Sequence, residues 1–381
     1  MESLLIIIAI IICISYAVLV LSFFRGISNL KTETSEGLAS ERKTQFTIII
    51  PFRNEAKRIS VLLNSLAKIN YDTSCYEFIF VDDASEDDSV AIIKSFFTTR
   101  TSTDYQIIQN VRMTLSPKKD AISTAIAQAK FEWILTTDAD CRVPSTWLLS
   151  FNDFLKESNA IFIAGPVTYE IENTFEDRFE LLDFLGLMGS TMGGFGIQKP
   201  FLCNGANLAY KKKLFLELNG FDNNSHIAGG DDIFMLQKVK ESYPDRIQFL
   251  KDLKAVVTTY PQGSFKKLFS QRMRWAAKTS AYKDRFAILT GSIVFTMNLL
   301  LAGVAVGTLL TKGSLFLLVG VYLLKFNVDF MLLYRTAKFF EQEKELKVFF
   351  PVSLIHPFFN VAVAVRSFFG SYKWKGRSFN K

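Results

Sequence analysis

The sequence predicts a mixed α/β domain with a largely parallel sheet, attached to membrane-spanning helices at both ends. Two observations lead to this prediction. Hydrophobic residues gather into one long uncharged run near the N-terminus and three further apolar runs near the C-terminus. Between them, short strand patterns alternate with helix patterns, which is the arrangement of a parallel sheet covered on both faces.

The composition excludes several classes of protein. The 381 residues are 49% hydrophobic and 21% charged, which rules out an intrinsically disordered chain. Two histidines are too few for a site with three histidine ligands, and no Cys-x-x-Cys spacing exists, so a zinc ribbon or disulfide framework is not expected. The formal net charge of +7 suits an anionic partner without distinguishing nucleic acid, lipid and small anions.

The first hydrophobic run predicts an uncleaved N-terminal anchor over residues 1–25. Residues 4–24 are uncharged and would form a helix about 32 Å long, enough to cross the hydrocarbon core. A cleaved signal peptide is the alternative, but it usually has a basic start and a small-residue cleavage site, whereas this run follows Glu2 and ends in Ser-Phe-Phe-Arg. The polar residues 26–44 are expected to be a linker.

The C-terminal membrane region, residues 286–381, is expected to contain two clear spans, at about 286–310 and 314–334. Lys325 and Asp329 lie four residues apart in the second span, so they share one helix face. Because an unpaired charge is costly at bilayer depth, we expect them to form an ion pair that faces other protein segments. The alternative is that Lys325 extends to the membrane surface and Asp329 marks the cytoplasmic end of the span.

Basic residues predict that the middle of the chain is cytoplasmic. No basic residue precedes the first span and several follow it, so the positive-inside rule places residues 25–285 in the cytoplasm. Residues 265–285 are strongly basic and are predicted to form an interfacial helix. A full crossing at about 348–365 would export the basic tail, so a re-entrant hairpin broken at His356-Pro357 is favoured over a third C-terminal span.

Residues 45–264 are predicted to form the α/β domain. The expected strands are 45–52, 77–81, 105–109 and 131–137, with helices after the first strand and at 118–130. Ligands of such sheets bind beyond the carboxyl ends of the strands. Acidic clusters follow the second and fourth strands directly, so the chemistry is expected at this edge.

Each acidic cluster allows two interpretations. Asp138 and Asp140 flank one small residue, and a pair of this kind can hold Mg²⁺ or Mn²⁺ while leaving positions open for phosphate oxygens. The alternative is an aspartate turn that caps the next helix. Asp231 and Asp232 precede another helix and have the same two interpretations, and nearby His226 is expected to be a packed loop residue rather than a metal ligand.

Five motifs in a fixed order are far more specific than any one of them. They are Ile48-Ile49-Ile50-Pro51-Phe52-Arg53-Asn54-Glu55, Val81-Asp82-Asp83-Ala84-Ser85, Asp138-Ala139-Asp140, Gly230-Asp231-Asp232 and Gln271-Arg272-Met273-Arg274-Trp275. This order resembles glycosyltransferase family 2, the inverting transferases of the GT-A fold. The last motif is similar to the Gln-x-x-Arg-Trp of the membrane-bound branch, which includes ceramide glucosyltransferase and the cellulose, chitin and hyaluronan synthases.

The resemblance implies a nucleotide-sugar donor, with a UDP-sugar favoured, and a divalent cation, Mg²⁺ or Mn²⁺. Asp138 and Asp140 would hold the metal, and Asp83 would accept a hydrogen bond from the base. The donor-binding residues that the resemblance implies are Pro51, Glu55, Asp83, Lys119, Asp138 and Arg274. The sequence departs from the usual pattern at Lys118-Lys119, where Gly-Lys is commoner.

For the acceptor, the resemblance implies that Asp232, with Asp231 beside it, deprotonates a hydroxyl, because direct inverting displacement needs one positioned base. The pair is Asp-Asp here where Glu-Asp is usual. Trp275 and Gln271 would contact the acceptor, a membrane lipid or lipid-linked saccharide.

The sequence therefore predicts an integral membrane glycosyltransferase with a cytoplasmic catalytic domain and no nucleic-acid partner. Two alternatives stay open: a subunit of a processive polysaccharide synthase, and a catalytically silent membrane scaffold. A third, a sugar-nucleotide-forming nucleotidyltransferase, is disfavoured because a Gly-rich loop does not follow the first strand.

Overall fold

The computed structural model describes most of the chain, which divides into two compact units. The described residues are 2–31, 43–100, 103–172, 174–225, 227–311, 313–369, 372–374 and 377–379. The helical unit consists of Met1–Leu30, Ile171–Phe201 and Pro261–Lys381, and the sheet unit consists of Lys31–Glu170 and Leu202–Tyr260. The chain therefore alternates between units along its length.

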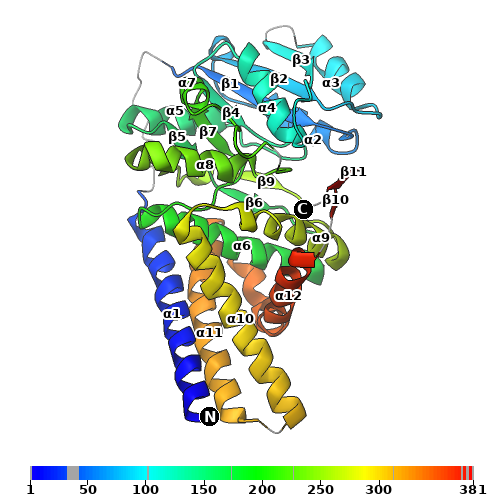
Figure 1. Ribbon diagram of the computed structural model, residues 1–381. Coiled ribbons are helices and arrows are strands. Elements are labelled where there is room, and N and C mark those ends of the chain that lie inside the picture. The colour runs from blue at the N-terminus through cyan, green and yellow to red at the C-terminus, as the bar shows by residue number, and fades with distance from the viewer. Residues whose placement is uncertain are drawn as a thin grey trace. The chain divides into compact units, whose positions relative to one another are not determined.

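In the described part of the sheet unit, seven strands form one sheet in the order β3-β2-β1-β4-β7-β5-β8 (Figure 1). They are β1 (Phe46–Phe52), β2 (Tyr76–Asp82), β3 (Tyr105–Gln109), β4 (Trp133–Thr136), β5 (Phe162–Ala164), β7 (Leu208–Lys211) and β8 (Ile247–Phe249). The first four are mutually parallel, and β7 runs opposite to both of its neighbours. A second, two-stranded sheet pairs β6 (Val167–Tyr169) with β9 (Val257–Thr259).

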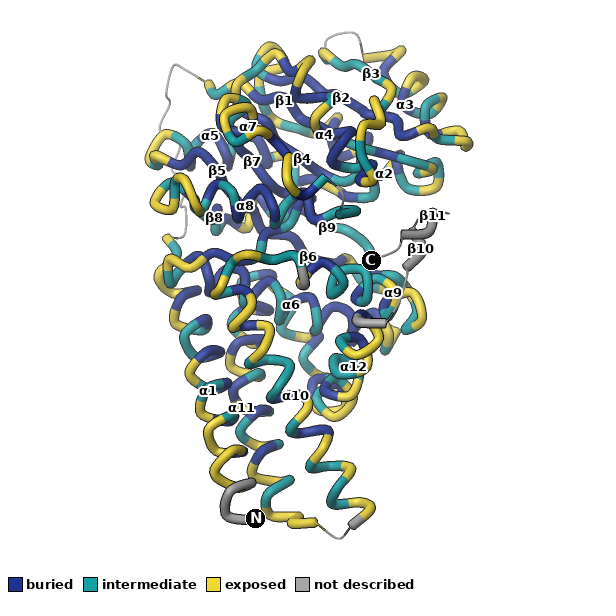
Figure 2. The backbone as a smooth tube through the Cα atoms, in the orientation of Figure 1, coloured by how far each residue is buried: buried dark blue, intermediate teal, exposed yellow. Residues whose placement is uncertain are grey.

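The central strands are covered on both faces, and this explains their unbroken apolar sequences. Ile48, Ile49 and Ile50 of β1 are completely buried, as Figure 2 shows for the strand as a whole. The helices of this unit are α2 (Ile59–Leu66), α3 (Ser89–Thr98), α4 (Pro117–Gln128), α5 (Trp147–Glu157), α7 (Lys212–Glu217) and α8 (Asp231–Ser242). The predicted α/β class, with its four leading strands, is confirmed.

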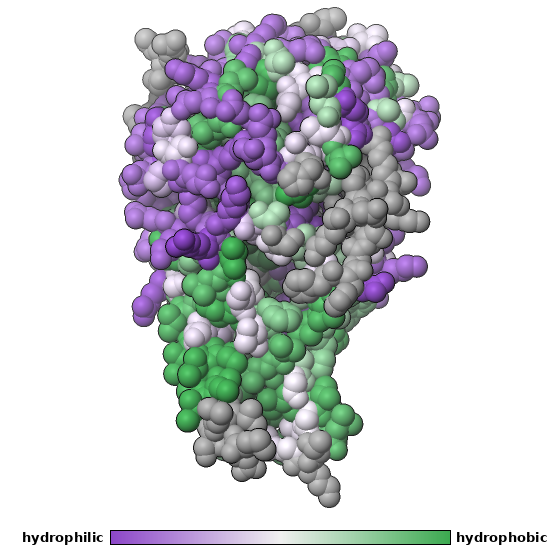
Figure 3. Space-filling view, viewed as in Figure 1, coloured by the Kyte–Doolittle hydropathy of each residue, from purple (hydrophilic) through white to green (hydrophobic). Residues whose placement is uncertain are grey.

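The helical unit contains α1 (Glu2–Asn29), α6 (Phe175–Gly196), α9 (Phe265–Ala276), α10 (Arg285–Thr311), α11 (Leu315–Phe339) and α12 (Phe349–Phe369), and the short pair β10 (Tyr372–Trp374) and β11 (Arg377–Phe379). Among the described residues, four helical segments are long and apolar enough to cross a membrane: Ile6–Asn29, Arg285–Leu310, Leu315–Phe339 and Glu343–Ser367. Figure 3 shows hydrophobic side chains over much of the surface of these helices, whereas the visible surface of the sheet unit is mostly hydrophilic.

Short 3₁₀ turns complete the described secondary structure: η1 (Thr73–Cys75), η2 (Pro244–Arg246), η3 (Leu253–Ala255), η4 (Thr279–Ala281) and η5 (Glu343–Val348).

Helix α6 is the main element that the sequence analysis did not predict, and it packs closely against α1. A Cβ atom on Gly193 would lie 2.5 Å from the Cα of Phe23, and one on Gly26 would lie 2.2 Å from the carbonyl oxygen of Gly193. Glycine at these positions is therefore what lets the two helices approach. The continuous catalytic domain expected over 45–264 is interrupted, because residues 171–201 pack with the helical unit.

Helix α12 differs from the favoured sequence expectation. It continues through Pro357 as one helix, so the re-entrant hairpin with a break at His356-Pro357 is wrong for this segment. An apolar helix satisfies its backbone groups internally, and a proline removes only one of those hydrogen bonds, so continuing the helix costs less than exposing a broken chain to an apolar surrounding.

Candidate active site

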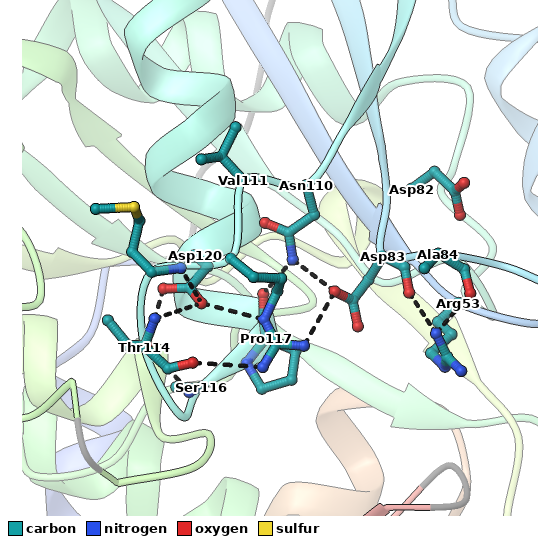
Figure 4. Close-up of polar contacts among 12 residues, drawn as sticks. Arg53, Asp82, Asp83, Ala84, Asn110, Val111, Thr114, Ser116, Pro117 and Asp120 are labelled. Atoms are coloured by element: carbon teal, nitrogen blue, oxygen red, sulfur yellow. Dashed lines mark hydrogen bonds and ion pairs between the residues drawn. The ribbon is translucent and has the colours of Figure 1, made fainter.

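The parallel strands bring three acidic segments to one edge of the sheet unit. β1, β2 and β4 end at Phe52, Asp82 and Thr136, and the motifs with Glu55, Asp83 and Asp138 follow directly. The ends of β1 and β2 are tied together by Arg53, whose Nη1 donates to the carbonyl oxygens of Asp83 at 2.6 Å and Ala84 at 2.5 Å (Figure 4). The loops at this edge are therefore fixed.

Asp83 is held by polar neighbours just beyond the end of β2. Its Oδ1 accepts a 2.7 Å hydrogen bond from Asn110 Nδ2 (Figure 4) and lies 3.4 Å from Arg112 Nη1. Arg112 in turn contacts Asp120 at 3.2 Å. Asp83 is only 7% exposed, so its orientation is set before any ligand arrives.

Pro51 and Glu55 lie near the carboxyl end of β1, at the same edge of the sheet. Pro51 is half-buried within β1 opposite Val81 of β2. Glu55 follows the strand, and its backbone N–H donates to Ser89 Oγ at 2.8 Å. Both residues thus lie at the carboxyl edge where the sequence places them.

Lys118 links the aspartates after β4 to those that start α8. Its Nζ lies 2.6 Å from Asp138 Oδ1 and 3.5 Å from Asp231 Oδ2. Burial by itself would lower the pKa of Lys118, but Asp138 and Asp231 raise it above its ordinary value, so the ammonium stays charged. Two motifs that are far apart in sequence therefore share one cation.

Asp138 and Asp140 have the chemistry that a divalent cation needs. Their side chains are 37% and 34% exposed, and Arg58 lies 3.8 Å from Asp140. No group of three or more His, Cys, Asp or Glu side chains suited to a metal occurs among the described residues. Mg²⁺ is commonly held by one or two carboxylates together with substrate phosphates and water, so this pair fits a cation that is completed by a diphosphate.

Asp231 and Asp232 open α8, and two glycines with left-handed backbone conformation, Gly229 and Gly230, precede them. Asp232 Oδ2 accepts a hydrogen bond from the backbone N–H of Gly205 at 3.1 Å. Asp231 is 7% exposed and faces Lys118, whereas Asp232 is half-buried. Of the two carboxylates, Asp232 is the more accessible.

Lys119 is not placed as the sequence analysis expected for a donor-binding residue. Its side chain has no accessible surface, and its Nζ donates to the carbonyl oxygens of Asn224 at 2.7 Å and Ile227 at 3.1 Å. Its ammonium also lies 4.5 Å from the ring centre of Phe234. Lys119 thus fixes the loop before α8, and its neighbour Lys118 takes the place at the acidic edge. In the sequence, the adjacent lysines Lys118 and Lys119 indicate that a lysine lies near the acidic edge, but they do not show which of the two side chains points toward it.

Gln271, Arg274 and Trp275 lie on α9 in the helical unit, and all three are half-buried. The structure describes their surroundings within that unit, so their roles toward donor and acceptor stay predictions. His226 lies outside the described residues.

The chain matches two sequence families. Residues 47–218 match the model of Glycosyl transferase family 2, and residues 133–360, more than half of the chain, match that of Glycosyl transferase family group 2.

Among characterised proteins, the chain is similar to glycosyltransferase AglE of Haloferax volcanii, with 23% identity over 230 residues that cover 60% of this chain and 70% of AglE. It is also similar to the poly(ribitol-phosphate) β-N-acetylglucosaminyltransferase TarS of Staphylococcus aureus, with 29% identity over 116 residues, 30% of this chain and 20% of TarS.

Among solved structures, the mannosyltransferase PcManGT of Pyrobaculum calidifontis, in complex with GDP-Man and Mn²⁺, has a similar fold. The TM-score is 0.60 at 18% identity, and the match covers 93% of this chain and 99% of PcManGT.

Proposed function

The chain belongs to glycosyltransferase family 2, and on that basis we propose that it transfers a sugar, with inversion, from a nucleotide-sugar to a lipid or lipid-linked saccharide acceptor at the cytoplasmic face of a membrane. The observation that carries this proposal is the acidic edge of the sheet unit, where Lys118 joins Asp138 to Asp231. A silent scaffold would not need paired charges at that edge, with Asp231 buried, since a buried charge is costly to keep.

Asp83 is proposed to recognise the base of the donor. A carboxylate accepts hydrogen bonds only, and both uracil and guanine present a ring N–H to such an acceptor. A UDP-sugar is favoured. PcManGT was solved with GDP-Man, so guanosine donors belong in the same test.

Asp138 and Asp140 are proposed to hold Mg²⁺ or Mn²⁺. When bound, such a cation offsets the charge that develops on the departing nucleoside diphosphate. Lys118 supplies a second positive charge close to Asp138, and Arg274 is proposed to bind the same diphosphate through its fork of N–H groups.

Asp232 is proposed to act as the base. The acceptor oxygen attacks the anomeric carbon from the face opposite the phosphate, its proton passes to Asp232, and the bond from the anomeric carbon to the phosphate oxygen breaks. The hydrogen bond from the N–H of Gly205 orients this carboxylate. Asp231 is already paired with Lys118, so its proposed contribution is to position that lysine.

A membrane-associated acceptor is supported by the four apolar helices and by the basic helix α9, which begins with Lys266 and Lys267 after Phe265. A processive synthase that exports its polymer would need a protein-lined path, and the four apolar helices among the described residues leave little room for one. We therefore favour the addition of one sugar, or very few, to each acceptor.

The test is to incubate the protein in nanodiscs with Mg²⁺ or Mn²⁺, a lipid extract and a panel of radiolabelled UDP- and GDP-sugars, and then to size the products and determine their anomeric configuration. We expect one donor to label a lipid fraction with inverted configuration, and Asp232→Asn to abolish transfer while it still binds the donor. A ladder of long polymer from a monomer would favour the processive alternative. No transfer from any donor, with extracts of several sources, would contradict the proposal.

A further inference from the structure

Arg272 is the buried member of the Gln271–Trp275 motif. It is 6% exposed, whereas its neighbours in the motif are half-buried. Its guanidinium carbon lies 4.2 Å from the ring centre of Trp275, and its Nη1 donates to Gln271 Oε1. One side chain therefore contacts both of the residues that we propose for the acceptor.

Arg272 is held in turn by Asp183, which α6 contributes. Arg272 Nε donates to Asp183 Oδ2 at 2.6 Å, and the two side chains are 7% and 9% exposed. The other carboxylate oxygen lies 2.9 Å from His356 Nε2 on α12. Burial alone would raise the pKa of Asp183, but Arg272 and His356 together hold it well below its usual range, so the carboxylate is ionised.

His356 has a further contact, because Asn360 Nδ2 lies 3.2 Å from its Nδ1 and 3.3 Å from its Nε2. The chain of contacts thus runs from Trp275 through Arg272 and Asp183 to His356, across α9, α6 and α12.

Aromatic side chains pack across the same three helices. Phe179 of α6 packs against Phe265 of α9 at 5.1 Å and against Phe359 of α12 at 5.2 Å, and Phe269 packs against Phe359 at 5.9 Å. Hydrogen bonds and ion pairs are stronger in a buried, low-dielectric environment than in water. A change in Asp183 is therefore expected to alter the position of Arg272 and of the residues that Arg272 contacts.

We propose that Asp183 is the positioning residue for the acceptor side of the active site: through Arg272 it sets the orientation of Trp275 and Gln271, and through His356 it ties that orientation to α12. This inference rests on the proposed function. The competing explanation is that the Arg272–Asp183 pair only holds the helices together.

The same helix offers a matched control for that explanation. Arg178, also on α6, forms a 2.8 Å ion pair with Glu345 of η5, and these side chains are 10% and 6% exposed. The two pairs are alike in length and burial, but the partner of Arg178 lies on η5, whereas the partner of Asp183 lies within the α9 motif. A purely structural role predicts the same consequences when either pair is broken.

The experiment compares Asp183→Asn with Glu345→Gln in the nanodisc assay, with titration of the lipid fraction that the wild-type protein labels. We expect both variants to lose thermal stability. Only Asp183→Asn should raise the KM for that lipid fraction, by about ten- to a hundredfold, by analogy with the loss seen when a residue that orients a metal-binding side chain is removed. Donor affinity should stay within about twofold, and Asp183→Glu should restore part of the acceptor KM.

Arg272→Lys covers the case in which Asp183→Asn fails to fold. Lysine keeps the positive charge beside Asp183 but has no planar fork to stack on Trp275 and reach Gln271. We expect this variant to fold and to show the same rise in acceptor KM. A normal acceptor KM in Arg272→Lys, or an equal rise in Glu345→Gln, would overturn the inference. An inactive wild-type protein would instead count against the proposed function.

Discussion

Tyr16 of α1 donates a 2.5 Å hydrogen bond to Asp329 of α11, a residue 313 positions later in the chain. Lys325, one turn before Asp329, pairs with the same carboxylate. The expected Lys325–Asp329 pair is thus present, and it faces α1. These three polar groups satisfy one another between two apolar helices, where an unpaired charge would be costly.

Lys325→Leu should destabilise the helical unit more than the double change Lys325→Leu, Asp329→Leu. The single variant leaves the Asp329 carboxylate without its cation in an apolar surrounding, at a cost of about 3 kcal/mol, whereas the double variant removes both charges. The measurement is the free energy of unfolding in mixed detergent micelles. Losses that simply add would show that the two residues act independently.

Lys118→Met and Lys119→Met should have opposite phenotypes. Lys118→Met should remain folded, with some loss of stability, and lose about a hundredfold in kcat, because Asp138 and Asp231 lose the cation between them. Lys119→Met should lower the free energy of unfolding by about 2–3 kcal/mol, because the buried carbonyls of Asn224 and Ile227 lose their donor. Steady-state kinetics beside thermal unfolding tests both. A stable, donor-deficient Lys119→Met would restore the original assignment of that residue.

Asn110→Ala should raise the KM for the nucleotide-sugar by about tenfold with little change in kcat. The substitution removes the 2.7 Å hydrogen bond that orients Asp83, and hydrogen bonds to charged groups contribute about 1.5–3 kcal/mol. Gln109→Ala is the control, because Gln109 contacts the adjacent Asp82 at 3.1 Å. Equal effects of the two changes would argue against a base contact at Asp83.

Asp140→Asn should abolish transfer without unfolding the protein, since its side chain is about one-third exposed and its neutral form is a weaker ligand for a hard cation. Excess chelator should have the same effect on the wild-type enzyme, and Mg²⁺ or Mn²⁺ should reverse it. Full turnover in chelator would exclude the metal from the mechanism.

The stability that Asp183 contributes should depend on pH in one direction. Its folded-state pKa is lowered, so its contribution is complete above the unfolded value of about 3.9 and is lost as the pH falls through the folded value. The difference in melting temperature between the wild-type protein and Asp183→Asn should therefore be smaller at pH 3 than at pH 5. A constant difference would mean that the carboxylate is not ionised in the folded protein.

The sequence could predict elements whose signals are local. The β-branched run before Pro51 predicts β1, and the acids after β2 and β4 predict the edge at which chemistry is proposed. Contacts between distant segments could not be predicted in this way. Gly193 is a helix residue that makes room for α1, and Asp183 carries no motif at all. Its importance becomes visible only when α6, α9 and α12 are seen together.

The alternation of the chain between its two units has a consequence for synthesis. Tyr16 leaves the ribosome 313 residues before Asp329 does, which at about 5–20 residues per second is a delay of roughly 15–60 s. During that time α1 exists without α11. The packing of α1 against α6 through Gly26 and Gly193 is the first contact between long helices of the helical unit that can form. The order of synthesis thus makes the α1–α6 contact an early step in assembly. Bulky substitutions at Gly26 or Gly193 are therefore expected to reduce the amount of protein that assembles, before they affect the activity of the folded enzyme.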